Sequence, residues 1–345
     1  MDYAYLGNTD VKVSKICLGT MTFGEQNTEE EGHEQLDYAL DHEVNFIDTA
    51  EMYPVPGRSE TQGRTEEIIG TWIQKRKNRD AFILASKVVG PTNMTWIREN
   101  AGFKSNQIQE AIEGSLRRLQ TDYIDLYQLH WPERPTTMFG VRNYPADKSD
   151  RWEDNFQAVL TKMQSLVEEG KIRYFGLSNE TPWGTMHFLK MAEKYNLPRC
   201  VSIQNPYNLL NRHYEVGLSE VSMMEKVGLL AYSPMAFGLL SGKYEDGTDT
   251  SFSRLNQFKQ MSRYDGTGSR AAAKKYIQLA KDHQLSPAQM SLAFINDQPF
   301  VTSNIIGATD MIQLKDNIES IQVKLTPEIL KEINAIHEEI PNPSC

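Results

Sequence analysis

Cysteines and long apolar runs are both scarce in this sequence. Its three cysteines, Cys17, Cys200 and Cys345, lie too far apart for a disulfide framework or a cysteine-based zinc site. No apolar run approaches the roughly 20 residues that a membrane span needs. The net charge of −10 argues against nonspecific attraction to nucleic acid phosphates or anionic lipid. Because residues 1–5 do not begin a secretion signal either, we expect a cytoplasmic protein.

Three familiar motifs are approached but not completed. The segment 19–24 lacks the middle glycine of the Rossmann fingerprint, and 238–244 is one residue too short for a phosphate-binding P-loop. The segment 176–180 lacks the second glycine of a nucleophile elbow. No His-Glu-x-x-His motif or other metal-ligand spacing occurs, so no metal site is expected. Each missing motif argues against the class of enzyme that depends on it.

What the sequence does have is a regular alternation of short apolar runs and helical patterns. Continuous apolar runs predict strands that are covered on both faces, and strands that alternate with helices predict parallel pairing. The strands are expected within 14–18, 45–48, 82–86, 123–129, 172–177, 200–204, 228–232 and 304–306. The helices are expected at 29–42, 65–76, 105–119 with Ser105 as its cap, 155–169, from 181 onward, 214–226, 271–283, 287–297, 311–318 and 327–338.

Eight such units favour a closed (β/α)8 barrel over an open sheet. Gly-Asn turn chemistry within 4–13 predicts a small hairpin before the barrel. No interdomain linker is visible, so we expect residues 1–345 to form one α/β domain. Three long connections, 54–64, 131–151 and 236–269, follow strand ends on the C-terminal face, where barrel enzymes place their active sites.

Four reactive side chains follow three successive predicted strands. Asp48 ends one strand and Tyr53 follows it by five residues, while Lys87 and His130 end the next two. Tyr53 is the candidate proton donor to a carbonyl oxygen, because an ammonium group close to a phenol lowers the phenol's pKa from its usual value near 10. Asp48 would keep Lys87 charged, and a neutral His130 would donate an N–H to the same oxygen.

Each of these residues has an ordinary structural explanation when it is taken alone. Tyr53 could be a loop residue, Asp48 a turn cap, Lys87 a solvated strand end and His130 a buried structural histidine. All four are expected at the same end of one barrel, because parallel strands place their C-terminal ends on the same face. This common location favours the catalytic interpretation.

The sequence resembles the aldo-keto reductases, and these four residues match the Asp, Tyr, Lys, His tetrad of that family. The resemblance covers nearly the whole chain, and the segment 52–56 with its long loop is similar to the Tas-type bacterial NADP(H)-dependent reductases. The matching segments are 19–21, 48–53, 86–87, 128–131, 176–179, 204–207, 232–235 and 306–309.

The resemblance implies that NADP(H) lies across the top of the barrel without a Rossmann domain. Ser178, Asn179 and Gln204 would hold the carboxamide, and Tyr232 would stack on the nicotinamide. A helix N-terminus after Thr309 would attract phosphate. The full cofactor set would be Gly19, Thr20, Met21, Asp48, Ser178, Asn179, Gln204, Tyr232, Ser233, Pro234, Met235, Gly238, Leu240, Lys243, Arg254, Gly307, Thr309, Gln313 and Asn317.

The 2′-phosphate has no obvious partner, because 303–310 contains no lysine or arginine. Arg254 or Arg263 from the long loop could supply the charge. The substrate would lie against Phe23, Tyr53, His130 and Trp131. The aromatic residues Phe23, Trp131 and Phe139 favour an apolar or aromatic carbonyl compound, whereas Arg58, Arg134 and Arg142 favour an anionic one, and the sequence does not choose between them.

We therefore expect an NADPH-dependent reductase of aldehydes or ketones that acts on a small-molecule substrate, with no nucleic acid or membrane partner. One alternative is an NADP(H)-binding regulatory or redox-sensing subunit similar to the β subunits of potassium channels, which resemble this barrel. Another is an aldolase or isomerase in which Lys87 forms a Schiff base. The physiological substrate and the oligomeric state cannot be deduced from the sequence.

Overall fold

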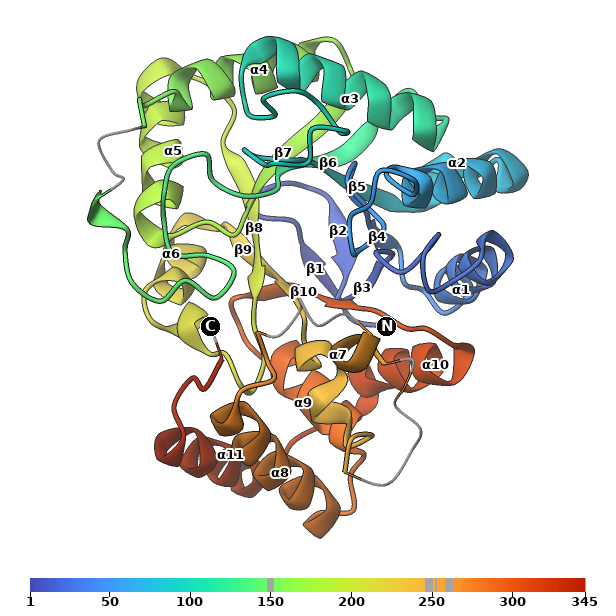
Figure 1. Cartoon of the computed structure of the whole chain (residues 1–345), viewed down its shortest axis with the longest axis vertical. Coiled ribbons are helices and arrows are strands. Elements are labelled where there is room, and N and C mark those ends of the chain that lie inside the picture. Colours follow the sequence, from blue (N-terminus) through green and yellow to red (C-terminus); the bar gives the residue numbers. More distant parts are fainter. Residues whose placement is uncertain (148–151, 246–250, 252, 258–262, 345) are drawn as a thin grey trace.

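Eight parallel strands close into a barrel at the centre of the computed structural model, which describes residues 1–147, 152–245, 251, 253–257 and 263–344. The strand order is β10-β3-β4-β5-β6-β7-β8-β9, and β10 closes the barrel by pairing with both β3 and β9. The predicted (β/α)8 barrel is confirmed (Figure 1). The barrel strands are β3 (Ile16–Gly19), β4 (Phe46–Asp48), β5 (Ile83–Val88), β6 (Ile124–Leu129), β7 (Ile172–Ser178), β8 (Cys200–Pro206), β9 (Gly228–Tyr232) and β10 (Val301–Ile306).

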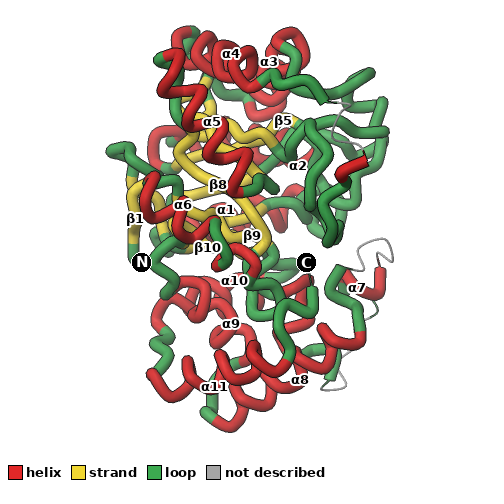
Figure 2. Tube along the Cα trace, turned by 90° about the vertical axis from the view of Figure 1, so that its left-hand side faces the viewer, coloured by secondary structure: helices red, strands yellow, loops and turns green. Residues whose placement is uncertain are grey.

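Helices surround the barrel and cover the outer face of its strands (Figures 1 and 2), while inward-facing side chains pack against one another inside it. Three of these helices begin with a capping Ser or Thr followed by proline, which lacks the N–H that a first turn leaves unpaired. The helices are α1 (Glu29–Asp41), α2 (Arg64–Arg76), α3 (Ser105–Leu119), α4 (Phe156–Glu168), α5 (Pro182–Tyr195), α6 (Leu218–Glu225), α7 (Arg254–Gln257), α8 (Thr267–Asp282), α9 (Pro287–Asn296), α10 (Met311–Glu319) and α11 (Pro327–Glu339).

An antiparallel hairpin of β1 (Tyr3–Tyr5) and β2 (Lys12–Ser14) precedes the barrel, as predicted. Its apolar side chains Leu6 and Val13 are fully buried in one cluster with inward-facing residues of the barrel strands, such as Phe46 and Leu126. The hairpin therefore closes the N-terminal mouth of the barrel and leaves the opposite mouth for the site.

Two local predictions were wrong. The single helix predicted at 214–226 is divided, because Gly217 has a φ of +102°, a left-handed conformation that ends a 3-10 turn at His213–Glu215 before α6 begins. Ser105 does not cap α3; it is the first helical residue, and Lys104 at the cap position donates no side-chain bond. The long connection at 236–269 also contains a 3-10 turn (Ala236–Ser241) and the short helix α7, and α8 begins before residue 271.

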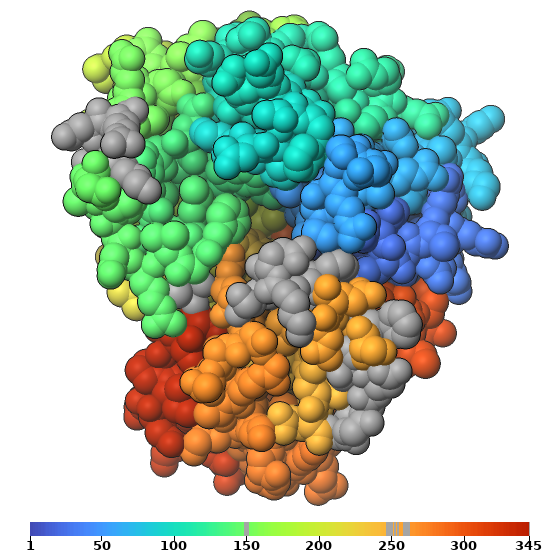
Figure 3. Space-filling model, in the orientation of Figure 1, coloured from blue at the N-terminus to red at the C-terminus, as the bar shows by residue number. Residues whose placement is uncertain are grey.

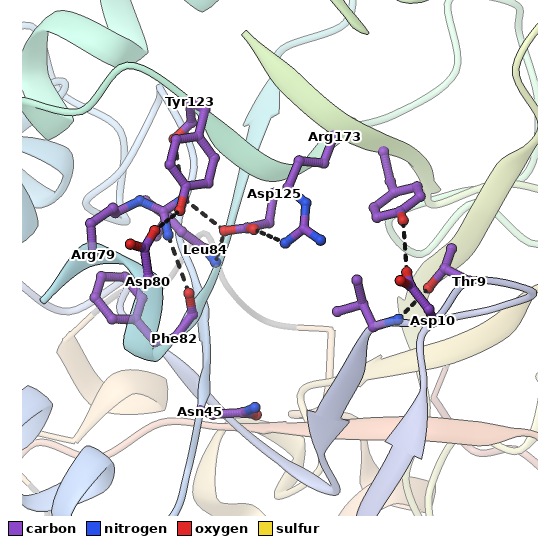
Figure 4. Close-up of polar contacts among 12 residues, drawn as sticks. Thr9, Asp10, Asn45, Arg79, Asp80, Phe82, Leu84, Tyr123, Asp125 and Arg173 are labelled. Carbon is purple, nitrogen blue, oxygen red and sulfur yellow. Dashed lines mark hydrogen bonds and ion pairs between the residues drawn. The ribbon is translucent and has the colours of Figure 1, made fainter. Parts of the chain in front are cut away.

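A buried carboxylate joins three strands near the N-terminal end of the barrel. Asp125 of β6 accepts hydrogen bonds from Arg79 Nη2 at 2.7 Å, from the Leu84 amide at 3.0 Å and from Arg173 Nη1 at 2.8 Å. Figure 4 shows both guanidinium groups directed at this carboxylate. Its side chain is 2% exposed, so the two arginines compensate a charge that has almost no access to water.

Replacing Asp125 with alanine should therefore lower the free energy of unfolding by about 3–5 kcal/mol, the usual cost of breaking a buried ion pair. Urea denaturation measures this change. The exposed Asp122, three residues earlier, provides the control, and Asp122→Ala should change stability by less than about 0.5 kcal/mol. Equal unfolding midpoints for the two variants would contradict the structural role of Asp125.

Candidate active site

The four reactive side chains converge at the C-terminal mouth of the barrel. Asp48 is the last residue of β4, Lys87 lies near the end of β5, and His130 directly follows β6. Tyr53 returns to them from the loop after β4, where its amide bonds the Ala50 carbonyl at 3.0 Å. Parallel strands end on the same face, which is why residues so far apart in the chain meet here.

Lys87 is the centre of this group. Its Nζ donates to Asp48 Oδ2 at 2.6 Å, to the Thr49 carbonyl at 2.8 Å and to the Tyr53 hydroxyl at 3.3 Å. The lysine side chain is completely buried. Burial by itself lowers the pKa of the Lys87 amine, but the attraction of Asp48 and then of Tyr53 outweighs it, so the pKa is raised. Lys87 is therefore an ammonium ion, in hydrogen-bonding distance of the phenol.

Asp48 is held by neutral donors as well as by Lys87. Its Oδ1 accepts from Gln204 Nε2 at 2.8 Å and from Gln128 Nε2 at 3.1 Å, and Gln204 also bonds Gln128. Gln128 stands opposite Lys87 in the β5–β6 register. No role was predicted for Gln128, a polar residue that lies two positions before His130 in a strand that also contains Asp125.

His130 is buried beside the lysine and is kept neutral. Burial first, and then the positive charge of Lys87, lowers the pKa of His130 well below its usual 6.5. Its ring lies edge-on to the Tyr53 ring at a centroid distance of 5.8 Å, and its backbone carbonyl accepts from Asn179 Nδ2 at 2.8 Å. Its Nδ1 is buried and has no hydrogen-bond partner among the described residues. A neutral imidazole can donate one N–H to a ligand at this mouth.

This lowered pKa makes folding stability depend on pH. Below pH 6.5 the unfolded protein protonates His130 while the folded protein does not, so stability is retained above pH 6.5 and falls as the pH drops. His130→Gln should reduce that slope by up to about 1.4 kcal/mol per pH unit between about pH 6 and pH 5. Urea denaturation across this range measures the slope for both proteins. A His130→Gln slope equal to that of wild type would show that His130 titrates normally.

The ends of β7 and β9 bring three predicted cofactor residues together. Asn179, in a left-handed conformation with φ of 53°, accepts from the Tyr232 hydroxyl at 2.7 Å. Ser178 donates to the Gln204 carbonyl at 2.8 Å and accepts from Asn179 Nδ2 at 3.1 Å. Arg263 Nη1 donates to the Tyr232 hydroxyl at 3.3 Å. The predicted carboxamide and stacking residues thus form one hydrogen-bonded group.

The segment after β9 turns sharply around the predicted pyrophosphate residues. Positive φ angles of 55° at Ser233, 57° at Phe237 and 87° at Gly238 bend the backbone back on itself. A Cβ on Gly238 would lie 2.9 Å from Lys243 Nζ, so the lysine side chain lies directly against this turn, and the φ of 87° favours glycine there. Of the remaining predicted residues here, Pro234 and Met235 lie in the turn, and Leu240 is buried in the core.

On the neighbouring strand of the barrel, Gly307 follows β10 with open space where a side chain would be. Thr309 is exposed, and its amide lies 3.3 Å from Gln313 Oε1. Asn317 is buried and donates to the Gly307 carbonyl at 3.2 Å, so it supports this turn from below. Gly19, Thr20 and Met21 lie beside it at the end of β3, where Thr20 Oγ1 donates to the Asp48 carbonyl at 2.8 Å.

The predicted substrate residues do not all reach the mouth. Trp131 lies beside His130 with the ring planes tilted by 43° and the ring centroids 4.9 Å apart. Phe23, in contrast, is completely buried, and its ring is among the atoms nearest to where a side chain on Gly32 of α1 would lie. Phe23 therefore packs under α1 and is not retained among the substrate residues. Arg254 lies on α7, but its side chain is outside the described part of the structure.

A second buried ion pair next to Tyr53 was not predicted from the sequence. Glu51 bonds Arg98 through both oxygens, including Arg98 Nη2 to Oε1 at 2.8 Å, and accepts from the Val89 amide at 2.7 Å. This pair ties the loops after β4 and β5 together two residues from Tyr53. A glutamate at the end of an apolar strand is the only sequence signal for it.

The helices of the described residues include none with both the length and the apolar composition to cross a membrane.

Comparison with known proteins places these features in a wider group. The sequence model described as Aldo/keto reductase family matches residues 15–338. Protein tas of Escherichia coli K12 is 50% identical over 345 residues, covering 98% of each chain. The uncharacterized oxidoreductase YrpG of Bacillus subtilis 168 is 34% identical over 342 residues, covering 97% of this chain and 96% of that protein. A probable voltage-gated potassium channel subunit beta of Oryza sativa subsp. japonica is 30% identical over 353 residues, covering 99% and 98%.

Proposed function

Because the chain belongs to the aldo/keto reductase family, we propose that it reduces aldehydes or ketones to alcohols with NADPH and that Tyr53 is the general acid. The family and its oxidoreductase-named members support an oxidoreductase. The observation that carries the finer proposal is the buried Lys87 ammonium, which contacts both Asp48 and the Tyr53 hydroxyl.

Each member of the tetrad then has a distinct role. NADPH, when bound, supplies the hydride that reduces the carbonyl carbon. The Tyr53 hydroxyl gives its proton to the carbonyl oxygen, and the Lys87 ammonium stabilises the phenolate that remains. Asp48 keeps Lys87 charged and directed at Tyr53. His130 stays neutral and donates an N–H to the same oxygen, which fixes the position of the carbonyl group.

Residues that follow the adjacent strands β7, β8, β9 and β10 fit a dinucleotide. Asn179 and Gln204 carry amides suited to a carboxamide, and the Tyr232 ring ends β9 beside them. Gly238 allows Lys243 close to the turn after β9, where it would counter pyrophosphate charge. Gly307 leaves its surface open at the far end of this path. These residues would hold NADP(H) extended across the barrel.

The position of α7 favours Arg254 over Arg263 as the partner of the 2′-phosphate. Gln257 of α7 accepts from Gln26 at 3.4 Å, and the neighbouring Asn27 donates to the Thr309 carbonyl at 3.0 Å. The helix that carries Arg254 is therefore linked to the Thr309 end of the path. Arg263 instead bonds Tyr232, at the nicotinamide end.

Arg254→Ala should weaken NADPH binding by about tenfold and leave NADH binding within about twofold, since one charge-assisted hydrogen bond contributes about 1.5–3 kcal/mol. Titration of the purified protein with each cofactor, followed by fluorescence, measures both affinities. Lys331→Ala on the exposed side of α11 is the control and should change neither. Equal affinities of wild type for NADPH and NADH would contradict the NADP(H) assignment, and failure to bind either would remove the basis of the mechanism.

The relatives named as potassium channel β subunits support a second candidate, an NADP(H)-binding regulatory or redox-sensing subunit. Measuring aldehyde turnover separates the two proposals. A reductase converts many molecules of aldehyde to alcohol, whereas a binding subunit can act without reducing any carbonyl compound. The Schiff-base alternative is less well supported, because a nucleophilic amine must be neutral and the raised pKa of Lys87 keeps it protonated.

A further inference from the structure

A cavity of about 310 Å³ opens beside the tetrad, on the side of Asn179, a volume suited to a small organic ligand. Its walls come from three places in the chain: the loop after β6, the ends of β7 and β8 with the turns that follow them, and Arg263 before α8. On the face shown in Figure 3, the green atoms of the loop after β6 lie close to the orange atoms of the segment that leads into α8. None of the proposed tetrad residues lines this cavity.

Two chains of contacts connect the cavity with the reacting position. The first is a series of aromatic contacts, in which Tyr53 lies edge-on to His130 and His130 contacts Trp131. Trp131 in turn lies edge-on to Phe139, with ring centroids 5.9 Å apart, and Phe139 forms part of the cavity wall. In the second, Asn179 and Arg263 line the cavity, and both bond the Tyr232 hydroxyl. The walls of the cavity are therefore in direct contact with residues that surround the reacting position.

The cavity has an excess of positive charge, although the chain as a whole is acidic. Arg142 donates to the Pro343 carbonyl at 3.2 Å, and Arg263 to the Tyr232 hydroxyl. Neither forms an ion pair with a carboxylate among the described residues. Among the described residues of the lining, the one acidic side chain is Glu180, which is already paired with Arg134, whose Nη1 donates to it at 2.9 Å.

The other arginines considered for an anionic substrate are already engaged. Arg58 pairs with Glu25 at 3.0 Å, and Arg134 with Glu180. The field of Arg142 extends into the cavity, where it acts on another lining residue: burial first, and then the charge of Arg142, lowers the pKa of His213. His213 therefore lies within the electrostatic reach of Arg142.

The rest of the lining is apolar and partly open to solvent. Phe139 is 50% exposed and Val216 is 78% exposed, high values for large apolar side chains. Phe139 also has a φ of 51°, a strained conformation for a bulky residue that often marks a ligand contact. The guanidinium group of Arg263 lies 5.6 Å from the centre of its ring. This combination suits a flat or branched apolar body that carries an anionic group.

We infer that this cavity binds the far end of the substrate, and that the preferred substrates are carbonyl compounds with an apolar body and a carboxylate held by Arg142 and Arg263. The inference rests on the proposed reductase function, for which it names a substrate class. Arg142 and Arg263 determine specificity in this account, and Phe139 and Val216 cover the apolar body.

Matched pairs of aldehydes test this inference. The pairs are 4-formylbenzoate and the longer 4-formylcinnamate, each compared with its methyl ester, which keeps the shape and removes the charge. With NADPH, wild type should show a kcat/KM at least about tenfold higher for the acid than for the ester in at least one pair, since one charge-assisted bond contributes about 1.5–3 kcal/mol. Arg142→Gln should bring that ratio close to one, while the exposed Arg117→Gln on α3 should keep it.

A binding measurement separates this inference from the proposed function. Calorimetry with NADP⁺-loaded protein compares 4-(hydroxymethyl)benzoate and 4-(hydroxymethyl)cinnamate, the alcohols expected as products, with their methyl esters. Tighter binding of an acid that is lost in Arg142→Gln supports the cavity even if no aldehyde is reduced. Reduction of acids and esters at equal kcat/KM overturns the cavity assignment and leaves the reductase intact. An acid preference that survives Arg142→Gln overturns it as well, and so does the absence of both turnover and acid binding.

Discussion

Replacing Tyr53 with phenylalanine should lower kcat for carbonyl reduction by about 10²–10⁴-fold, the range expected when a general acid is removed. NADPH affinity should stay within about twofold, because the ring remains and only the hydroxyl is lost. The Lys87 ammonium lies 4.7 Å from the centre of that ring, a contact that phenylalanine preserves. Steady-state turnover of an aldehyde with NADPH, together with a fluorescence titration, measures both effects.

The hairpin provides a matched control for this substitution. Lys12 lies 5.2 Å from the centre of the Tyr5 ring, which resembles the Lys87–Tyr53 arrangement but is 56% exposed and far from the mouth. Tyr5→Phe should therefore leave turnover unchanged. If Tyr53→Phe kept more than about a tenth of the wild-type kcat, proton donation by Tyr53 would be contradicted, because general acid catalysis contributes at least about a hundredfold.

Replacing Lys87 with methionine should reduce both activity and stability. The phenolate that forms at Tyr53 would lose its neighbouring cation, so we expect kcat to fall by at least about a hundredfold. Asp48 would remain buried without its ion-pair partner, which should lower the free energy of unfolding by about 3–5 kcal/mol. Aldehyde turnover and urea denaturation of the same preparation give the two values.

A double variant distinguishes the two roles of Lys87. Lys87→Met combined with Asp48→Asn removes the unpaired charge, while the side chain at 48 can still bond Gln128 and Gln204. Stability should then recover most of the about 3–5 kcal/mol lost in Lys87→Met, because replacing both partners of a buried ion pair leaves no unpaired charge. Activity should not recover. A double variant as unstable as Lys87→Met would indicate that packing of the lysine chain, rather than its charge, stabilises the mouth.

The barrel and the tetrad were predictable because their signals are local. Each strand is a short apolar run, and each reactive residue comes at or just after the end of one, so the alternation with helices places Asp48, Lys87 and His130 on one face. The division at Gly217 was missed because a glycine within a helical pattern is compatible with a continuous helix, and only the backbone shows its positive φ.

The residues that hold the tetrad in place were less predictable, because their hydrogen bonds join strands that are far apart in the sequence. Gln128 and Gln204 bond the same Asp48 oxygen from strands 76 residues apart, a convergence that only the register of the barrel produces. Likewise, Arg134 and Arg142 are equivalent in the sequence, eight positions apart in one loop. In the folded loop, however, Arg134 forms an ion pair with Glu180, whereas Arg142 lines the cavity. The path of the loop determines this difference.

The central claim is tested most directly by the stoichiometry of one reaction. Protein, NADPH and 4-formylbenzoate are mixed, and the NADPH consumed is compared with the alcohol formed. We expect equal amounts of the two, formed over many turnovers by wild type and strongly reduced in Tyr53→Phe. Tight NADPH binding without alcohol formation from this or any other aldehyde tried would contradict the reductase proposal and favour the regulatory subunit.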